Sequence, residues 1–273
     1  MIKIHTAGPS GSKYDDWRVR AIKKRDKDIA NWKENGRPRP GPKPNQELWA
    51  ELKQIFLSDV FHDKCAYCEG NHASGYPAHV EHYRPKLMVT EERQAIDHPG
   101  YFWLAYEWEN LLLSCAHCNS NHSSIKDGEK VSHYGKLNEF RIQGQRVSEP
   151  SADPSQWQKE LKAEQPLLLN SYDDEEPNLH IGFSKDGTVY AKTGKGKETV
   201  DVCDLNRIEL VEARRSEAKK SARTRIYDRL AVIERDQTKI DEPFFDPSEP
   251  FSAWLNHYAM ILVENLFAPF AKT

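Results

Sequence analysis

The chain of 273 residues lacks any apolar run long enough to cross a membrane, and its first eleven residues lack an apolar signal-peptide core. These absences argue against a membrane protein and against export, so we expect a cytoplasmic protein. Excess charge is also missing: 39 basic and 42 acidic residues give a net charge of −3 at pH 7. Total charge therefore does not by itself indicate a nucleic-acid-binding protein.

Cysteine is scarce, but its spacing is informative. Four of the five cysteines form two C-x-x-C pairs, Cys65 with Cys68 and Cys115 with Cys118. Thiols stay reduced in the cytoplasm, so such pairs indicate a metal site before a disulfide. Two such turns complete the closed tetrahedral shell that structural Zn²⁺ prefers, and we predict a zinc site here. Two unrelated buried or redox pairs are the alternative, and the isolated Cys203 is predicted to be a small buried apolar residue.

Apolar spacing and turn residues predict a mostly helical α+β protein. Residues 37–44 (RPRPGPKP) should form an extended linker, because proline fixes φ and has no amide donor. Asn45 is a plausible cap for the helix that follows. The predicted elements are helices at 13–35, 45–59, 205–235 and 251–267, and hairpin strands at 179–183 and 188–191.

Polar residues between and beside the two cysteine pairs can support hydrolysis of a phosphodiester. Glu81 and His82 precede the second pair, Asn110 lies directly before an apolar run that leads into it, and Asn119 directly follows it. A neutral histidine can take a proton from water near pH 7. Carboxylate and amide oxygens suit a hard divalent ion such as Mg²⁺. Taken singly, the same residues could be a surface pair and two helix caps.

The order Glu-His, Asn-Leu and C-x-x-C-Asn resembles the HNH family of ββα-metal nucleases. The resemblance implies a zinc-knuckled ββα core with His82 as general base. It makes Glu81 and Asn119 ligands of a catalytic Mg²⁺ or Mn²⁺, and gives Asn110 the role of orienting the imidazole. Here Glu stands where Asp is commoner, and Asn119 replaces the final His. His122, three residues later, is an alternative final ligand.

Longer segments resemble one branch of that family, the Septu-type HNH nuclease subunits, which also occur beside retrons. They are CAYCE at 65–69, HVEHYRPK at 79–86, YFWLAYEWENLLLSCAHCNS at 101–120, QPLLLN at 165–170 and DLNRIELVEARR at 204–215. The resemblance, over about 61–229, implies an effector of bacterial antiphage defence that works with an ATPase subunit of the ABC or SMC-like kind. That branch has a lysine soon after its Cys-Asn pair. In this chain the first lysine after Cys118-Asn119 is Lys126.

These observations divide the chain into three regions. Residues 1–60 hold N-terminal helices and the proline-rich linker, 61–130 the zinc-bound nuclease core, and 131–273 a hairpin and helices that could dock a partner. Arg84 and Lys86, beside the proposed base, are candidates for phosphate contact. Trp254 and Tyr258 are candidate partner anchors or core residues.

The substrate and the catalytic role stay open at this point. The motif does not separate DNA from RNA, and a non-catalytic zinc module that binds nucleic acid or a protein is the competing function. The basic residues of the long helix are either a nucleic-acid face or a solvated face with glutamate partners. They are Arg207, Arg214, Arg215, Lys219, Lys220, Arg223, Arg225 and Arg229. The histidines near the motif, His72, His79 and His117, are expected to lie at the surface or behind the ligands.

Overall fold

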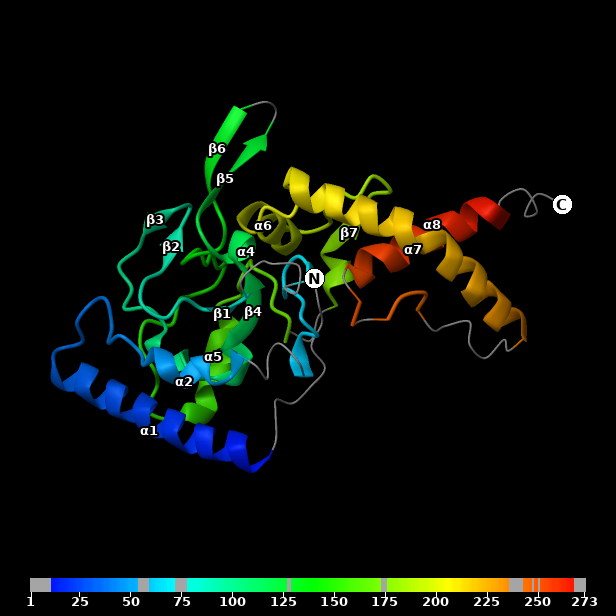
Figure 1. The fold of residues 1–273 in the computed structure, drawn as a ribbon. Helices are drawn as coiled ribbons and strands as arrows, with labels where there is room; N and C mark the ends of the chain where they lie inside the picture. The colour runs from blue at the N-terminus through cyan, green and yellow to red at the C-terminus, as the bar shows by residue number, and fades with distance from the viewer. Residues whose placement is uncertain are drawn as a thin grey trace.

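The computed structural model describes residues 11–53, 59–71, 78–126, 129–172, 176–235, 243–246, 248–249 and 251–267. Within them the fold is mixed, with helices around four two-stranded antiparallel sheets (Figure 1). The helices are α1 Ser12–Glu34, α2 Gln46–Ala50, α4 Ala116–Asn119, α5 Trp157–Ala163, α6 Gly194–Val202, α7 Ile208–Arg235 and α8 Ser252–Phe267. The strands are β1 Ala78–His82, β2 Thr90–Glu91, β3 Gln94–Ala95, β4 Leu111–Cys115, β5 His122–Lys126, β6 Glu129–Tyr134, β7 Ile181–Phe183 and β8 Val189–Ala191. Short 3₁₀ turns occupy Phe102–Leu104, Trp108–Asn110, Pro154–Gln156 and Pro177–Leu179.

Most of the predicted elements are confirmed. Helices α1, α7 and α8 and the β7–β8 hairpin lie where the apolar spacing placed them. The side chain of Asn45 accepts the backbone N–H of Glu47 at 3.0 Å, so the predicted cap opens α2. That helix ends at Ala50, and the part of the prediction at 54–58 lies outside the described residues. Helices α5 and α6 and the β5–β6 hairpin were not predicted, because these segments are polar and lack a clear apolar period.

The central ribbon of β1 and β4 positions the candidate site. The strands pair antiparallel from Ala78 opposite Cys115 at one end to His82 opposite Leu111 at the other. All five residues of β4 are buried, as expected for an apolar strand covered on both faces. The ribbon therefore lies inside the protein and has one cysteine end and one histidine end.

One hydrophobic core runs through the three regions into which the sequence was divided. The cluster of buried residues extends from Trp17 in α1 to Ala259 in α8 and includes Leu111–Leu113 of β4. α1 lies along one edge of the molecule, and α7 and α8 pack on each other at the opposite side (Figure 1). Among the described helices, none has the length and apolar character of a membrane span.

The β5–β6 hairpin is an insertion whose first and last residues lie close together beside α4. It starts just after α4, projects from the body (Figure 1), and returns so that the N–H of Lys136 donates to the carbonyl of Cys118 at 2.8 Å. Gly135 makes the return possible: its φ is +97°, and a Cβ there would lie 2.1 Å from the carbonyl oxygen of Ser120. Lys126 is the last residue of β5 and so belongs to the projecting hairpin. Lys136 follows the hairpin and lies beside the second cysteine pair.

Candidate zinc centre and active site

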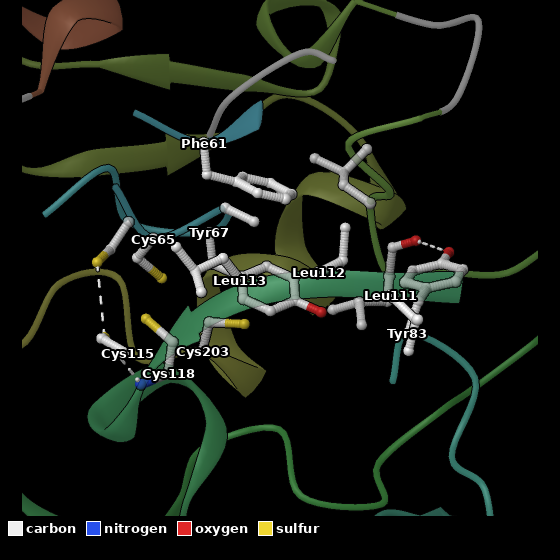
Figure 2. Packing of buried hydrophobic residues seen from close by; sticks show 14 of the residues in the cluster. Phe61, Cys65, Tyr67, Tyr83, Leu111, Leu112, Leu113, Cys115, Cys118 and Cys203 are labelled. Atoms are coloured by element: carbon white, nitrogen blue, oxygen red, sulfur yellow. Dashed lines mark hydrogen bonds between the residues drawn. The ribbon is translucent and has the colours of Figure 1, made fainter. Parts of the chain in front are cut away.

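The four predicted cysteines come together at one end of the central ribbon. Their sulfur atoms all lie within 4.8 Å of one another, and among the described residues they form the sole such group of three or more histidines, cysteines or carboxylates. Figure 2 shows Cys65, Cys115 and Cys118 together at the end of β4. Sulfurs of a tetrahedral Zn²⁺ site are roughly 3.8 Å apart, given Zn–S bonds of about 2.3 Å. The Cys68–Cys115 distance of 3.9 Å fits this geometry, so the four thiols suit one structural zinc ion.

Backbone hydrogen bonds shape the two cysteine turns. The N–H of Ala66 donates to the carbonyl of Leu113 at 2.8 Å, which docks the first turn on β4. The N–H of Gly70 lies 3.4 Å from the sulfur of Cys68, and the N–H of Cys118 lies 3.4 Å from the sulfur of Cys115. Amide donors of this kind stabilise charged thiolates, which are the zinc-binding form of cysteine.

Arg207 lies against the sulfur cluster, a role that the sequence did not reveal. Its guanidinium nitrogens are 3.7 Å from the sulfur of Cys118 and 4.0 Å from that of Cys115. The residue is 7% exposed, so its charge acts on the sulfurs with little screening. Four thiolates on Zn²⁺ carry a net charge of −2, which a buried guanidinium partly neutralises. In the sequence, Arg207 could not be told apart from the other basic residues near it.

His82 lies at the other end of the ribbon and is 3% exposed. Its Nε2 is 3.1 Å from the carbonyl oxygen of Ala105, and its Nδ1 is 3.3 Å from the ammonium of Lys86. A carbonyl can only accept, so Nε2 carries the proton and Nδ1 presents a lone pair. Burial, and then the charge of Lys86, hold the pKa of His82 well below its usual range. The imidazole is therefore neutral, with Nδ1 as its basic atom.

Asn110 braces the chain around this imidazole. Its Oδ1 accepts the N–H of Arg84 at 2.7 Å, and its Nδ2 donates to the carbonyls of Leu104 at 3.1 Å and Arg84 at 3.2 Å. Leu104 directly precedes Ala105, whose carbonyl holds His82. The buried amide thus fixes both the loop after β1 and the segment that orients the histidine.

Glu81 has a partner that no pattern in the sequence indicates. The ammonium of Lys136 donates to Oε1 of Glu81 at 2.6 Å and to the carbonyl of His82 at 2.8 Å. Within the described ranges no donor is bonded to the second carboxylate oxygen, Oε2. That oxygen is a suitable ligand for a hard divalent ion, although the first is already held by a cation. Lys136 follows an unpredicted hairpin, so no local pattern linked it to Glu81.

Asn119 is placed near the same face of β1. Its amide nitrogen lies 3.4 Å from Nδ1 of His79, and His79 and Glu81 point to the same side of the strand because they are two residues apart. The Nε2 of His122 lies 3.3 Å from the carboxylate of Asp204, and its Nδ1 lies 3.2 Å from a backbone carbonyl. Both ring nitrogens of His122 are therefore engaged, which leaves Asn119 the freer of the two candidate ligands.

The structure separates the two residues predicted to contact phosphate. Arg84 turns inward: its Nε donates to the fully buried carboxylate of Glu164 at 2.9 Å, and a terminal nitrogen donates to the carbonyl of Leu161 at 2.9 Å. A phosphate would have to break this ion pair to reach Arg84, so the structure favours a core ion pair for this residue, and its contact with substrate stays a prediction. Lys86 stays at the site, next to His82 and 5.0 Å from the ring of Trp49.

The structure also decides two points about the C-terminal region. Trp254 is 1% exposed and donates its indole N–H to the carbonyl of Ser184 at 3.2 Å, which selects the core residue from the two alternatives for Trp254. Arg207, which directly precedes α7, and Arg214 of α7 are both buried within the protein, so neither is part of an exposed basic face. The burial of Cys203 agrees with its predicted role, and His72 lies outside the described residues.

Comparisons with known proteins find two similar curated sequences. The chain is 34% identical over 190 residues to Septu protein PtuB of Bacillus mycoides (strain KBAB4), a match that covers 67% of this chain and 57% of that protein. It is 31% identical over 164 residues to Septu protein PtuA of the same strain, covering 60% of this chain and 20% of that protein. The chain thus spans little more than half of the first relative and a fifth of the second. No model of a known protein family matches the chain, and no solved structure matches it.

Proposed function

We propose that this protein is a zinc-stapled HNH-type endonuclease that hydrolyses phosphodiester bonds. The observation that carries the proposal is the environment of His82. Its Nε2–H is fixed on the carbonyl of Ala105, its Nδ1 lone pair is held beside Lys86, and its low pKa keeps it neutral. A neutral, oriented imidazole is what a general base needs to take a proton from water.

The neighbouring residues of His82 can serve the remaining requirements of the reaction. Lys86 supplies positive charge beside the base, where a phosphate would have to lie. Oε2 of Glu81 and the amide oxygen of Asn119 are the oxygen ligands that a divalent ion would use. When bound there, Mg²⁺ or Mn²⁺ would supply charge stabilisation at the phosphate and the departing oxygen. Asn110 fixes the surrounding backbone, and the cysteine turns hold β4 and α4 together.

The biological role follows from the similar sequences. Both relatives are Septu proteins, and the name PtuA beside PtuB points to a system of two proteins. We therefore infer that the chain acts in defence of bacteria against phage, together with a partner. The resemblance to Septu-type subunits makes an ATPase of the ABC or SMC-like kind the expected partner.

A non-catalytic zinc module is the second candidate, and one observation favours it. Glu81 and Arg84 are each paired with a buried residue of opposite charge, as structural residues are. Such a module would bind nucleic acid or a protein and would have no use for an oriented neutral imidazole.

Cleavage by the purified protein distinguishes the two candidates. Zinc-loaded protein, alone and with the product of its neighbouring gene, is incubated with plasmid and with total RNA, with and without Mg²⁺ or Mn²⁺. We expect metal-dependent cleavage of at least one substrate, lost in His82→Ala. Binding without cleavage under all these conditions would favour the non-catalytic module.

A further inference from the structure

Lys136 is a fully buried charge beside the candidate active site. It is 0% exposed, and its ammonium has three acceptors: Oε1 of Glu81 at 2.6 Å, the carbonyl of His82 at 2.8 Å and the carbonyl of Leu137 at 3.4 Å. An ammonium has three protons to donate, so every donor is used. A fully buried cation of this kind is tolerated only with such complete pairing.

The backbone around Lys136 connects the two ends of the central ribbon. Its own N–H donates to the carbonyl of Cys118 at 2.8 Å, and the N–H of Leu137 donates to the carbonyl of Asn119 at 2.7 Å. The same short segment therefore contacts the second cysteine turn, the residue proposed as a metal ligand, and the Glu81–His82 pair. A shift of the zinc turn would move the ammonium, and with it the carboxylate.

We propose that Lys136 is a positioning residue of the active site, which fixes Oε1 of Glu81 and leaves Oε2 to a divalent cation. This inference rests on the nuclease proposed above. The lysine has two opposing effects on that cation. It orients the carboxylate and the backbone of His82, which favours cleavage, and its positive charge repels the cation, which weakens binding.

These opposing effects predict a split between metal affinity and turnover. In Lys136→Met the carboxylate loses the cation that is hydrogen-bonded to it, and a divalent ion can take the place of that charge. We expect Mn²⁺ to bind about tenfold more tightly. Cleavage at saturating Mn²⁺ should nevertheless fall by about tenfold or more, because the carboxylate and the His82 carbonyl are no longer fixed. A purely structural lysine would weaken both properties together.

The test uses the full zinc-loaded chain, with Mn²⁺ binding followed by electron paramagnetic resonance and cleavage followed at saturating Mn²⁺. Lys136→Arg keeps the charge and should keep the wild-type Mn²⁺ affinity. Lys197→Met, which removes an exposed lysine that is paired with Asp201 on α6, is the matched control and should change neither property. If Lys136→Met does not fold, the neutral pair Glu81→Gln with Lys136→Met replaces it, and that double variant should lose Mn²⁺ binding.

Several outcomes separate this inference from the proposed function. An unchanged or weakened Mn²⁺ affinity in folded Lys136→Met overturns the role of Lys136, as does a neutral pair that still binds Mn²⁺ like wild type. A wild-type protein that binds no Mn²⁺ also overturns it. Mn²⁺ binding without cleavage of any nucleic acid would instead overturn the nuclease, and the affinity comparison would still decide the role of Lys136.

Discussion

The two ends of the β1–β4 ribbon are built on opposite principles. At the cysteine end, four buried sulfurs face one another and leave no coordination position open for a substrate. At the histidine end, Nε2 of His82 is held by the carbonyl of Ala105, Nδ1 lies beside the ammonium of Lys86, and Oε1 of Glu81 is held by Lys136. Among the described residues, Oε2 of Glu81 has no hydrogen-bond donor. The same short ribbon thus joins a cluster of four sulfurs, suited to a structural metal ion, to a buried polar group that we propose as the catalytic end.

The position of a residue on the ribbon therefore predicts whether its substitution affects folding or cleavage. Changes at the cysteine end should first affect folding and zinc content. Changes at the histidine end should first affect cleavage. The connection between the ends through Lys136 decides how strictly this division holds.

The largest expected effect is loss of the zinc centre in Cys115→Ser. Structural zinc contributes about 10–16 kcal/mol in small zinc domains, more than the whole stability of many folds, about 5–15 kcal/mol. We expect insoluble or unfolded protein with well under one zinc per chain, measured by metal analysis and circular dichroism. Cys203→Ala is the control, since it removes a buried thiol outside the cluster and should keep zinc. Folded, zinc-free Cys115→Ser would contradict the stabilising role of this end.

The next largest effect is loss of cleavage in His82→Ala, by about two to four orders of magnitude if the imidazole is the general base. Zinc content should be unchanged. His98→Ala is a matched control, because His98 is also buried and also bonded to a carbonyl, that of Val147 at 2.9 Å. It creates a similar cavity away from the site and should keep most of the cleavage. Equal losses in the two variants would mean that His82 acts through packing alone.

An intermediate effect is expected for Asn110→Ala. The Asn110 amide hydrogen-bonds the backbone of Arg84 and the carbonyl of Leu104. Its loss leaves these buried groups unpaired, which lowers the free energy of unfolding by about 1–3 kcal/mol. The histidine loses its support, and cleavage should fall by about 10–100-fold. Asn206→Ala is the control: the Asn206 amide makes a comparable pair of hydrogen bonds, with the backbone N–H and carbonyl of Val189, far along the chain from the site. If both variants lose stability while neither loses cleavage, Asn110 does not orient the base.

A smaller effect should appear at the cysteine end in Arg207→Met. The guanidinium stabilises the charged sulfurs, and without it zinc should be released to a chelator about tenfold faster. Arg214→Met is the control: Arg214 is equally buried, but its guanidinium bonds the carbonyls of Gly187 and Leu205. Release followed with a colorimetric zinc chelator should separate the two variants, and identical rates would show that the sulfur contacts of Arg207 are incidental.

The smallest effect is expected for His122→Ala. Both of its nitrogens are engaged, one with Asp204, so cleavage should change by no more than about threefold. Asn119→Ala should lose far more activity, and high Mn²⁺ should partly restore it. If the loss in His122→Ala matches that in Asn119→Ala, then His122 is the final ligand and must break its contact with Asp204.

The sequence determined the cysteine end almost completely. A C-x-x-C turn fixes two sulfurs within four residues, so spacing alone predicted the four members of the cluster. Long periodic helices such as α1, α7 and α8 were predictable for the same reason, because their signal repeats over neighbouring residues. The residue types Glu81, His82 and Asn110 were also visible, since their order is a local pattern.

Only the tertiary structure decided what those residues touch. The partners of the histidine end come from distant segments: Lys136 reaches Glu81 across 55 positions, and Glu164 removes Arg84 from the site across 80. Arg207 reaches Cys118 across 89 positions, and in the sequence it looks like the basic residues of the helix that follows it. Residue spacing shows only which groups are close along the chain. The partner of a buried charge is the oppositely charged group that folding places next to it. That pairing is a property of the fold, because the cost of burying a charge is offset only where the partner is held in place.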